Sequence, residues 1–249
     1  MATVRHLPNA PITEGLIDIR VRLRTDADTS LLAGLSERLR DSYRTFGPIV
    51  HQQVEVQFSP QQPASSHTVS RDLGVRYHSL PDERYVAQFQ LSGFTLSRLS
   101  PYETWDKLIA ETQRLWRIYV ECVSPQAVTR VATRFINNLR LPMQTGDRFE
   151  TYLAASPQVP QALPQSVSAF LQRVVIYSPQ LQANANVTQF WQPGNDADRV
   201  SVILDIDVYR ETEFSPDGVE MWEYLSQLRA LKNAVFFESL TEKAVELYL

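Results

Sequence analysis

The sequence has little of what most catalytic or metal sites require. Its 249 residues include one cysteine, Cys122, and four histidines, all in the first third of the chain. A single cysteine excludes an internal disulfide and a cysteine-based zinc site within one chain. No nucleophile elbow stands near a histidine, and the eight scattered glycines form neither a phosphate loop nor a dinucleotide fingerprint. We therefore expect no enzyme activity, no cofactor and no metal site.

Long apolar runs and an excess of positive charge are also missing. No stretch approaches the roughly 20 apolar residues that span a bilayer, and the opening residues MATVRHLPNAP lack the apolar run of a signal peptide. The sequence thus predicts a cytoplasmic protein without a membrane contact. A net charge of −4, with lysine only at positions 107, 232 and 243, argues against nonspecific binding of polyanions. Hydrophobic residues make up 43% of the chain, which is enough to fill a core.

Hydrophobic periodicity predicts a chain of alternating strands and helices. Alternating or apolar segments indicate strands at 12–23, 51–58, 74–80, 84–94, 128–141, 168–177, 186–191 and 199–209. Helices are expected over 31–43, from a capping box at Ser100-Pro101 to about 123, and from Ser215-Pro216 to near the C-terminus with a break near Asn233. Residues 59–72 and 142–166 are rich in proline and glutamine and are expected as loops, and turns are expected at 81–83 and 193–196.

The two halves of the chain resemble each other. Residues 85–101 align with 200–216, both segments end in Ser-Pro, and a tryptophan follows in each, Trp105 and Trp222. This similarity predicts two pseudo-repeat halves, 1–125 and 126–249, in one compact unit. Each half is expected to be a strand-helix-strand-strand-strand-helix unit, although a proline-rich segment replaces the first helix of the second half. The predicted fold class is α+β, with antiparallel sheets and helices packed on one side.

Three segments carry a resemblance to a known family: the opening PITEGLIDIRV, the central RVATRFIN and the closing LRALKNAVFFESLTEKA. They resemble a sporadically distributed family of uncharacterised bacterial proteins of about the same length. The most specific pieces are Glu14 with the preceding proline, the run Arg130-x-x-x-Arg134-x-x-Asn137, and residues 236–241. The resemblance implies a fold and candidate positions but no activity. Its patchy distribution resembles that of mobile defence and toxin–antitoxin genes.

The candidate binding residues lie on the polar faces of the expected strands and at one hairpin tip. They are Glu14, Asp18, Gln88, Gln90, Arg130, Arg134, Asn138, Trp191, Asp205 and Asp207. Arg130 and Arg134 share a strand face, so they can meet an anionic ligand or form a salt-bridge ladder with Glu14 and Asp18. We favour the ladder, and we favour ion pairs with arginine over a metal for Asp205 and Asp207. Trp191 fits a partner contact and strand-end packing about equally.

The leading functional hypothesis is a non-catalytic binding protein with a protein partner. It would act as a regulator or neutralising partner in a bacterial defence or toxin–antitoxin system. One alternative is a small-ligand sensor whose cleft between the halves is lined by Arg130, Arg134, Gln88, Gln90 and Asp205. Another is nucleic-acid binding across a saddle-shaped sheet, with nucleic acid not expected as the sole partner. The sequence predicts no oligomeric state.

Overall fold

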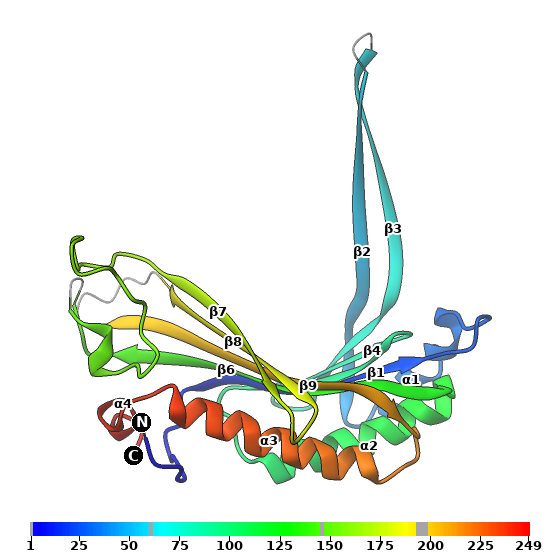
Figure 1. Ribbon diagram of the computed structural model, residues 1–249. Helices are drawn as coiled ribbons and strands as arrows, with labels where there is room; N and C mark the ends of the chain where they lie inside the picture. Colours follow the sequence, from blue (N-terminus) through cyan, green and yellow to red (C-terminus); the bar gives the residue numbers. More distant parts are fainter. Residues whose placement is uncertain (1, 60–61, 145–146, 193–198) are drawn as a thin grey trace.

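The fold is α+β and is built on one antiparallel sheet. The computed structural model describes residues 2–59, 62–144, 147–192 and 199–249, and their side chains except those of 52–69. The described strands form a nine-stranded sheet in the order β2-β3-β4-β5-β1-β6-β9-β8-β7, and every neighbouring pair is antiparallel (Figure 1).

The elements follow one another as the sequence alternates between strand and helix patterns. The strands are β1 (Ile12–Arg22), β2 (Tyr43–Ser59), β3 (Gln62–Ser79), β4 (Tyr85–Gln90), β5 (Gly93–Leu99), β6 (Ala127–Leu141), β7 (Leu171–Ser178), β8 (Ala183–Gln192) and β9 (Val200–Phe214). The α-helices are α1 (Leu35–Leu39), α2 (Trp105–Val123), α3 (Glu220–Glu238) and α4 (Glu242–Glu246). Short 3-10 helices at Thr29–Leu32 and Phe149–Thr151 complete the described helical segments.

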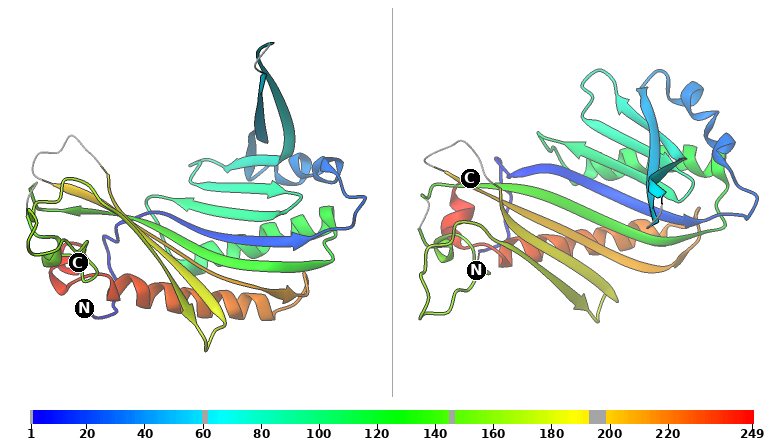
Figure 2. Two further views of the ribbon diagram at one scale, coloured as in Figure 1. Left: turned by 45° about the horizontal axis from the view of Figure 1, so that its top comes forward. Right: turned by 90° about the horizontal axis from the view of Figure 1, so that it is seen from above.

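The core lies between the central strands and the two long helices. α2 packs against β1 and β5, and α3 packs against β6 and β9, so both helices cover the same sheet face (Figures 1 and 2). Fully buried side chains from both layers meet there, among them Ile17, Ile19, Leu96, Leu108, Leu115, Tyr119, Leu204, Ile206, Leu225 and Leu228. Each such side chain contributes about 1.5–3 kcal/mol of transfer free energy. None of the helices in the described residues covers the opposite sheet face (Figure 1).

Strands β1 and β6 join the two halves at the middle of the sheet. Ile17 lies opposite Thr133 and Ile19 opposite Val131, so one continuous row of side chains crosses the junction. Gly15 is required here, because a Cβ atom would lie 2.8 Å from the ring of Phe135 and 3.0 Å from that of Tyr102. Those two rings pack edge-to-face, with centroids 5.2 Å apart.

The segment 59–72, expected as a loop, is largely part of a long β-hairpin. Strands β2 and β3 pair from Tyr43 with Ser79 out to Ser59 with Gln62. Cross-strand backbone hydrogen bonds satisfy such a ribbon without a run of apolar residues, so a composition rich in proline, glutamine and serine does not exclude it. The hairpin projects from the end of the sheet, on the side away from the helices (Figure 1).

The first expected helix, 31–43, is wrong as a single element. A 3-10 turn and the short α1 replace it, separated by Gly34, and Tyr43 belongs to β2. The 3-10 turn is capped by Asp28, whose carboxylate accepts a hydrogen bond from the Ser30 amide. The apolar stripe is still buried, because Leu32, Leu35 and Leu39 all point into the core.

The starts of the two long helices lie later than the Ser-Pro motifs predict. α2 begins at Trp105 and is capped by Thr104, whose hydroxyl accepts from the Lys107 amide. α3 begins at Glu220 and continues through Asn233 to Glu238, so the expected break near Asn233 is wrong. The chain leaves the helix at Ser239, before α4. The expected loop 142–166 contains the 3-10 turn at Phe149–Thr151. The expected turn at 193–196 lies outside the described residues.

The expected strand 84–94 is two strands, β4 and β5, joined by a tight turn at Leu91 and Ser92. Gly93 follows this turn at φ 151°, where a Cβ atom would lie 2.2 Å from the Ile19 carbonyl oxygen. The aligned segment 200–214 is by contrast the single strand β9. The alignment of 85–101 with 200–216 therefore pairs a hairpin with a strand over part of its length.

Candidate functional site

The predicted charged residues form a continuous polar network on the open sheet face. Asp18 of β1 accepts hydrogen bonds from Thr95 Oγ1 (2.8 Å), Arg20 Nε (3.0 Å) and an Arg130 guanidinium nitrogen (2.7 Å). Arg130 of β6 also forms an ion pair with Asp207 of the neighbouring strand β9 (3.3 Å). Its guanidinium lies over the Tyr209 ring, 4.5 Å from the ring centroid. The alternation of β1, β6 and β9 puts these side chains on one face, and the strand order brings them together.

A second ion pair lies beside the first. Arg134 donates to both carboxylate oxygens of Asp205, at 2.8 and 2.5 Å. This hydrogen bonding raises the pKa of Arg134, and the charges of Asp207 and Glu14 add to the effect. Burial raises the pKa of Asp207 above its ordinary value although Arg130 and Arg134 lie nearby. Of the predicted ladder of Arg130 and Arg134 with Glu14 and Asp18, the structure has the pair of Arg130 with Asp18, whereas Arg134 pairs with Asp205 and not with Glu14. Asp205 and Asp207 are partners of arginine.

The remaining predicted residues take less part in this network. Glu14 lies opposite Ile136 on β6, and Gln88 opposite Thr95 on β5. Gln90 accepts a hydrogen bond from Ser92 (3.3 Å), which in turn lies within 3.3 Å of Arg20. Asn138 has a buried side-chain oxygen for which the described residues offer no hydrogen-bond donor. Trp191 is partly buried in β8 and meets Phe149 edge-to-face, with centroids 5.8 Å apart, which fits packing.

The network limits what the open face can bind. Arg20, Arg130 and Arg134 all have a carboxylate partner, so a polyanion would have to compete with Asp18, Asp205 and Asp207. Within the described ranges, no three histidine, cysteine, aspartate or glutamate side chains gather as metal ligands would. Among the same residues, no helix combines the length and the apolar character that a membrane crossing requires.

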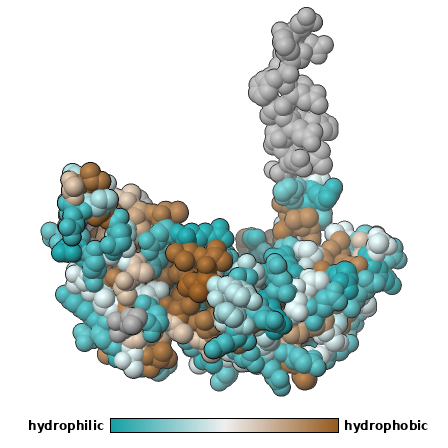
Figure 3. All heavy atoms as spheres, viewed as in Figure 1, coloured by the Kyte–Doolittle hydropathy of each residue, from teal (hydrophilic) through white to brown (hydrophobic). Residues whose placement is uncertain are grey.

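Strand β7 at the edge of the sheet exposes a cluster of apolar side chains, and the sequence prediction did not single it out. Val174, Val175, Ile176 and Tyr177 are 54%, 56%, 43% and 57% exposed, and Leu171 is 74% exposed. Among the described strands β7 pairs with β8 alone, so within this part of the chain its outer edge has no strand partner. Figure 3 shows a brown hydrophobic patch at the place where Figure 1 draws this strand.

The exposure of β7 has a simple structural cause. Val174 and Ile176 lie opposite Val187 and Ala185 of β8, on the same face as the core. β7 and β8, however, run beyond α3, so this face of β7 receives no helical cover (Figure 2). The sequence signal was a run of consecutive apolar residues, which is typical of a strand buried on both faces. The structure leaves both faces exposed.

A polar groove lies at the other end of the sheet, between α2 and the turn that joins β3 to β4. Its volume is about 760 Å³, and its lining includes Tyr85, Arg98 and Glu103. None of the ten predicted candidate residues lines it. The residues that were expected to line a cleft between the halves lie on the open sheet face. This groove is therefore a different place from the predicted cleft.

Comparison with family models and with curated proteins does not place this chain in a family. No protein-family model matches the chain, and no curated protein matches it. The functional argument therefore rests on the surfaces described above.

Proposed function

We propose that this chain is a non-catalytic binding protein that takes an extended segment of a protein partner onto strand β7. The observation that carries the proposal is the exposure of four consecutive apolar side chains, Val174 to Tyr177, on an edge strand. Folded proteins usually protect such edges with charges, proline or a covering element, because a free apolar edge pairs with other strands. β7 has a single charged residue, Arg173, and no proline.

The chemistry of β7 defines the partner. Main-chain hydrogen bonds would extend the sheet by one strand, and side-chain pockets on both faces would select the sequence. Because apolar side chains stand exposed on both faces of β7, an alternating polar strand would cover only one of them. We therefore expect an extended segment that is apolar on both faces, with an acidic residue near Arg173.

The neighbouring open face and the projecting β2–β3 hairpin are further surfaces for the same partner. Both lie on the side of the sheet away from the helices (Figure 1). The ion pairs on the open face would form a rigid polar surface under the partner. Such a surface contributes to the specificity of binding more than to its affinity. The family resemblance supports a cytoplasmic regulator or neutralising partner in a bacterial defence or toxin–antitoxin system.

We also infer that the chain arose by internal duplication. The sheet order β4-β5-β1 on one side of the centre corresponds to β8-β9-β6 on the other, and β1 and β6 meet in the middle. β5 leads into α2 as β9 leads into α3. Among the described elements the halves differ in three respects: the first has the extra strand β2, the second has only a 3-10 turn in place of the first helical segment, and the second adds α4.

The proposal is tested by a partner that is first identified in the producing organism and then purified. We expect Val175→Asp to weaken its binding by at least about tenfold, since burying a carboxylate in an apolar interface costs about 2 kcal/mol or more. Val4→Asp is the matched control, because Val4 is also exposed (61%) and lies outside β7. Equal affinities of the two variants, measured by calorimetry, would contradict a role for β7.

A further inference from the structure

The groove beside α2 is a second candidate site, separate from β7. The start of β2 and the β3–β4 turn form one of its walls, and one face of α2 forms the other. Side chains that recur every three or four residues along α2 line the helical wall, namely Lys107, Ala110, Glu111, Arg114 and Arg117. The volume of about 760 Å³ lies within the range of small-molecule sites.

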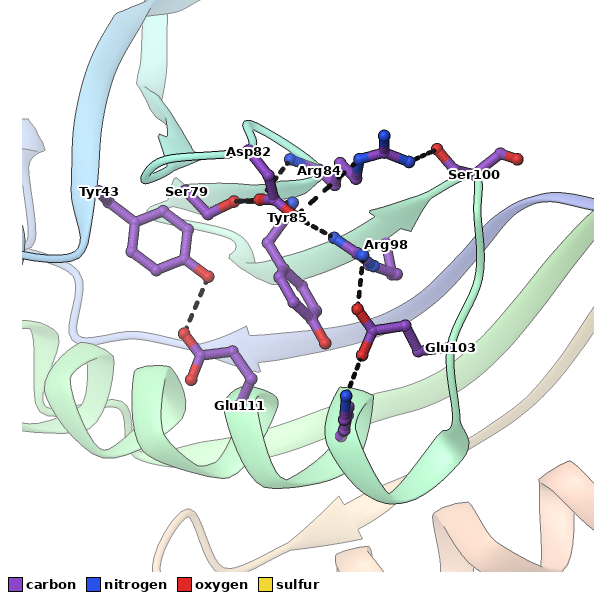
Figure 4. Close-up of polar contacts among 10 residues, drawn as sticks. Tyr43, Ser79, Asp82, Arg84, Tyr85, Arg98, Ser100, Glu103 and Glu111 are labelled. Atoms are coloured by element: carbon purple, nitrogen blue, oxygen red, sulfur yellow. Dashed lines mark hydrogen bonds and ion pairs between the residues drawn. The ribbon is translucent and has the colours of Figure 1, made fainter.

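Two carboxylates at one end of the groove are held by donors of the chain itself (Figure 4). Glu103 lies 2.8 Å from a guanidinium nitrogen of Arg98 and 2.5 Å from the Lys107 ammonium. The hydrogen bond from Lys107 lowers the pKa of Glu103, so this carboxylate is ionised. Asp82 accepts hydrogen bonds from the Ser79 hydroxyl (3.0 Å) and from Arg98 (3.1 Å). Neither carboxylate therefore needs a cation from a ligand.

The third carboxylate of the lining, Glu111, is held in the same way. The Tyr43 hydroxyl donates to it (2.9 Å), and Arg114 donates to both of its oxygens, at 2.9 and 2.7 Å. Hydrogen bonding to Glu111 raises the pKa of Arg114, so this cation stays charged at any physiological pH. Each carboxylate of the described lining thus has its donors within the chain.

Hydrogen-bond donors, by contrast, are left over. Arg117 is exposed, its Nε donates to the backbone oxygen of Gln113 (3.3 Å), and across the described ranges no carboxylate lies within ion-pair distance of it. Figure 4 shows the Tyr85 ring between Tyr43 and Arg98, with its hydroxyl toward α2, and within the described structure this hydroxyl makes no hydrogen bond. Burial raises the pKa of Tyr85, so the hydroxyl stays protonated and can donate. A ligand that fits these groups must supply acceptors.

The charge of the groove favours the same class of ligand. Four cationic side chains line it against three carboxylates, which leaves one positive charge in excess. The cations are Arg98, Lys107, Arg114 and Arg117. Arg114 uses Nε and Nη2 for Glu111 and Ser42, and its Nη1 has no described acceptor. Arg114 and Arg117 are three residues apart and so are neighbours on one helix face, where a single oxyanion can accept from both.

Part of the wall opposite α2 is apolar. Leu80 is 44% exposed, and Pro81 and the rings of Tyr43 and Tyr85 also line the groove. An inorganic ion would leave this surface in water, whereas an organic ligand would cover it and gain free energy. A ligand with many negative charges would also meet the carboxylates of the lining, so we expect a single anionic group.

We propose that this groove binds a small organic anion that joins one carboxylate or phosphate group to an apolar body. The anionic group lies between Arg114 and Arg117, and the apolar body covers Leu80 and Pro81. The Tyr85 hydroxyl donates a hydrogen bond to the ligand. The proposal goes beyond the binding of a protein partner at β7 and does not depend on it.

The test is titration of the purified full chain with benzoate and with phenyl phosphate, followed by calorimetry and thermal shift. Benzyl alcohol keeps the ring without a charge, benzylamine reverses the charge, and inorganic phosphate keeps the charge without the ring. We expect at least one of the two aromatic anions to bind, and benzyl alcohol and benzylamine not to bind. Inorganic phosphate should bind at least about tenfold more weakly than the aromatic anion, because it covers no apolar surface. The tighter of the two anions identifies the head group as carboxylate or phosphate.

Variants assign the site. Arg117→Gln is expected to weaken anion binding about tenfold and Tyr85→Phe several-fold, as for the loss of one charged and one neutral hydrogen bond. Arg148→Gln is the matched control, because Arg148 is an exposed arginine far along the chain, in the second half. The melting temperature of each variant without ligand shows that it is folded.

Three results would overturn the proposal. They are no binding of either aromatic anion, equal binding of benzyl alcohol or benzylamine, and binding of inorganic phosphate as tight as that of the aromatic anions, which would indicate an adventitious ion only. Anion binding that both groove variants leave unchanged would also overturn the assignment to this groove. None of these outcomes bears on β7, which lies at the opposite edge of the sheet from β2.

Discussion

The open face of the central strands and the edge strand β7 are two exposed parts of the same sheet, and their side chains are satisfied in different ways. On the open face, Arg130 and Arg134 meet the carboxylates of Asp18, Asp205 and Asp207. On β7, Val174 to Tyr177 are between 43% and 57% exposed and have no layer over them. The charged surface is thus complete within the chain, and the apolar surface is not.

This difference separates charged side chains that stabilise the fold from apolar side chains that are available to bind another protein. A partly buried charge is stable because its counter-charge is close, and removing either one leaves the other without compensation. An exposed valine contributes little to stability but gains free energy when another surface covers it. Substitutions on the open face should therefore affect unfolding, and substitutions on β7 should affect binding.

The largest expected effect is the loss of Arg130. Arg130→Ala removes an ion-pair partner of Asp207 and one of the two arginine partners of Asp18, whose side chain is only 9% exposed, and should lower the free energy of unfolding by about 3 kcal/mol. Urea unfolding of both proteins measures this difference. Arg148→Ala, at a side chain that is 84% exposed, is the control and should change stability by less than about 0.5 kcal/mol. A similar small change for Arg130→Ala would show that the ladder does not hold the sheet together.

Lys232 of α3 gives a contrasting case, because it packs on the helix-covered face of β6. Its ammonium lies 3.8 Å from the centroid of the Phe135 ring of β6, and among the described residues no carboxylate forms an ion pair with it. Burial, with a smaller effect from Arg229, lowers the pKa of Lys232 to about 7. The folded protein therefore binds fewer protons than the unfolded chain between about pH 7 and the ordinary lysine pKa of about 10.4, so stability rises with pH across this range.

Lys232→Met should remove this rise. We expect the variant to exceed the parent protein in stability by about 2 kcal/mol at pH 7, with a difference that shrinks as the pH approaches 10. Urea unfolding at pH 7 and pH 9.5 measures the change. A stability profile as steep as that of the parent protein would mean that Lys232 does not titrate in this range.

The smallest expected effect comes from a matched pair of valines. Val131→Thr puts a hydroxyl into the fully buried centre of β6 and should cost about 1–3 kcal/mol. Val175→Thr makes the same chemical change on β7, where the side chain is 56% exposed, and should cost less than about 0.5 kcal/mol. Thermal unfolding of the two variants compares the sites directly. Equal costs would show that β7 is already packed in the free protein.

Strand periodicity alone places alternate residues on one face, so the sequence predicted that the charged residues share a face, although the ladder it predicted for Arg130 and Arg134 was with Glu14 and Asp18. Arg130 and Arg134 had to share a face with each other, as did Asp205 and Asp207. The pairing of β9 with β6 could not be predicted, since strand order depends on long-range packing. That order decides that Arg130 meets Asp207 as well as Asp18.

The other two surfaces could not be predicted, for different reasons. The groove assembles residues from β2, β4, β5 and α2, and Tyr85, Arg98 and Glu111 belong to no local motif. For β7, the apolar run correctly predicts a strand, but it also predicts that the strand is buried. The burial could not be judged from the sequence, because α3 covers β6 and β9 and not the edge of the sheet. Local patterns determine the elements, whereas exposure depends on where distant elements pack.

Photo-crosslinking from β7 tests the central claim most directly. The amino acid p-benzoylphenylalanine in place of Val175, introduced in the producing organism, should crosslink to an extended apolar segment of one other protein. The same group in place of Val4, which is equally exposed, should not form that crosslink. No crosslink from position 175, the same crosslinks from both positions, or a crosslink only to a second copy of this chain would contradict the account.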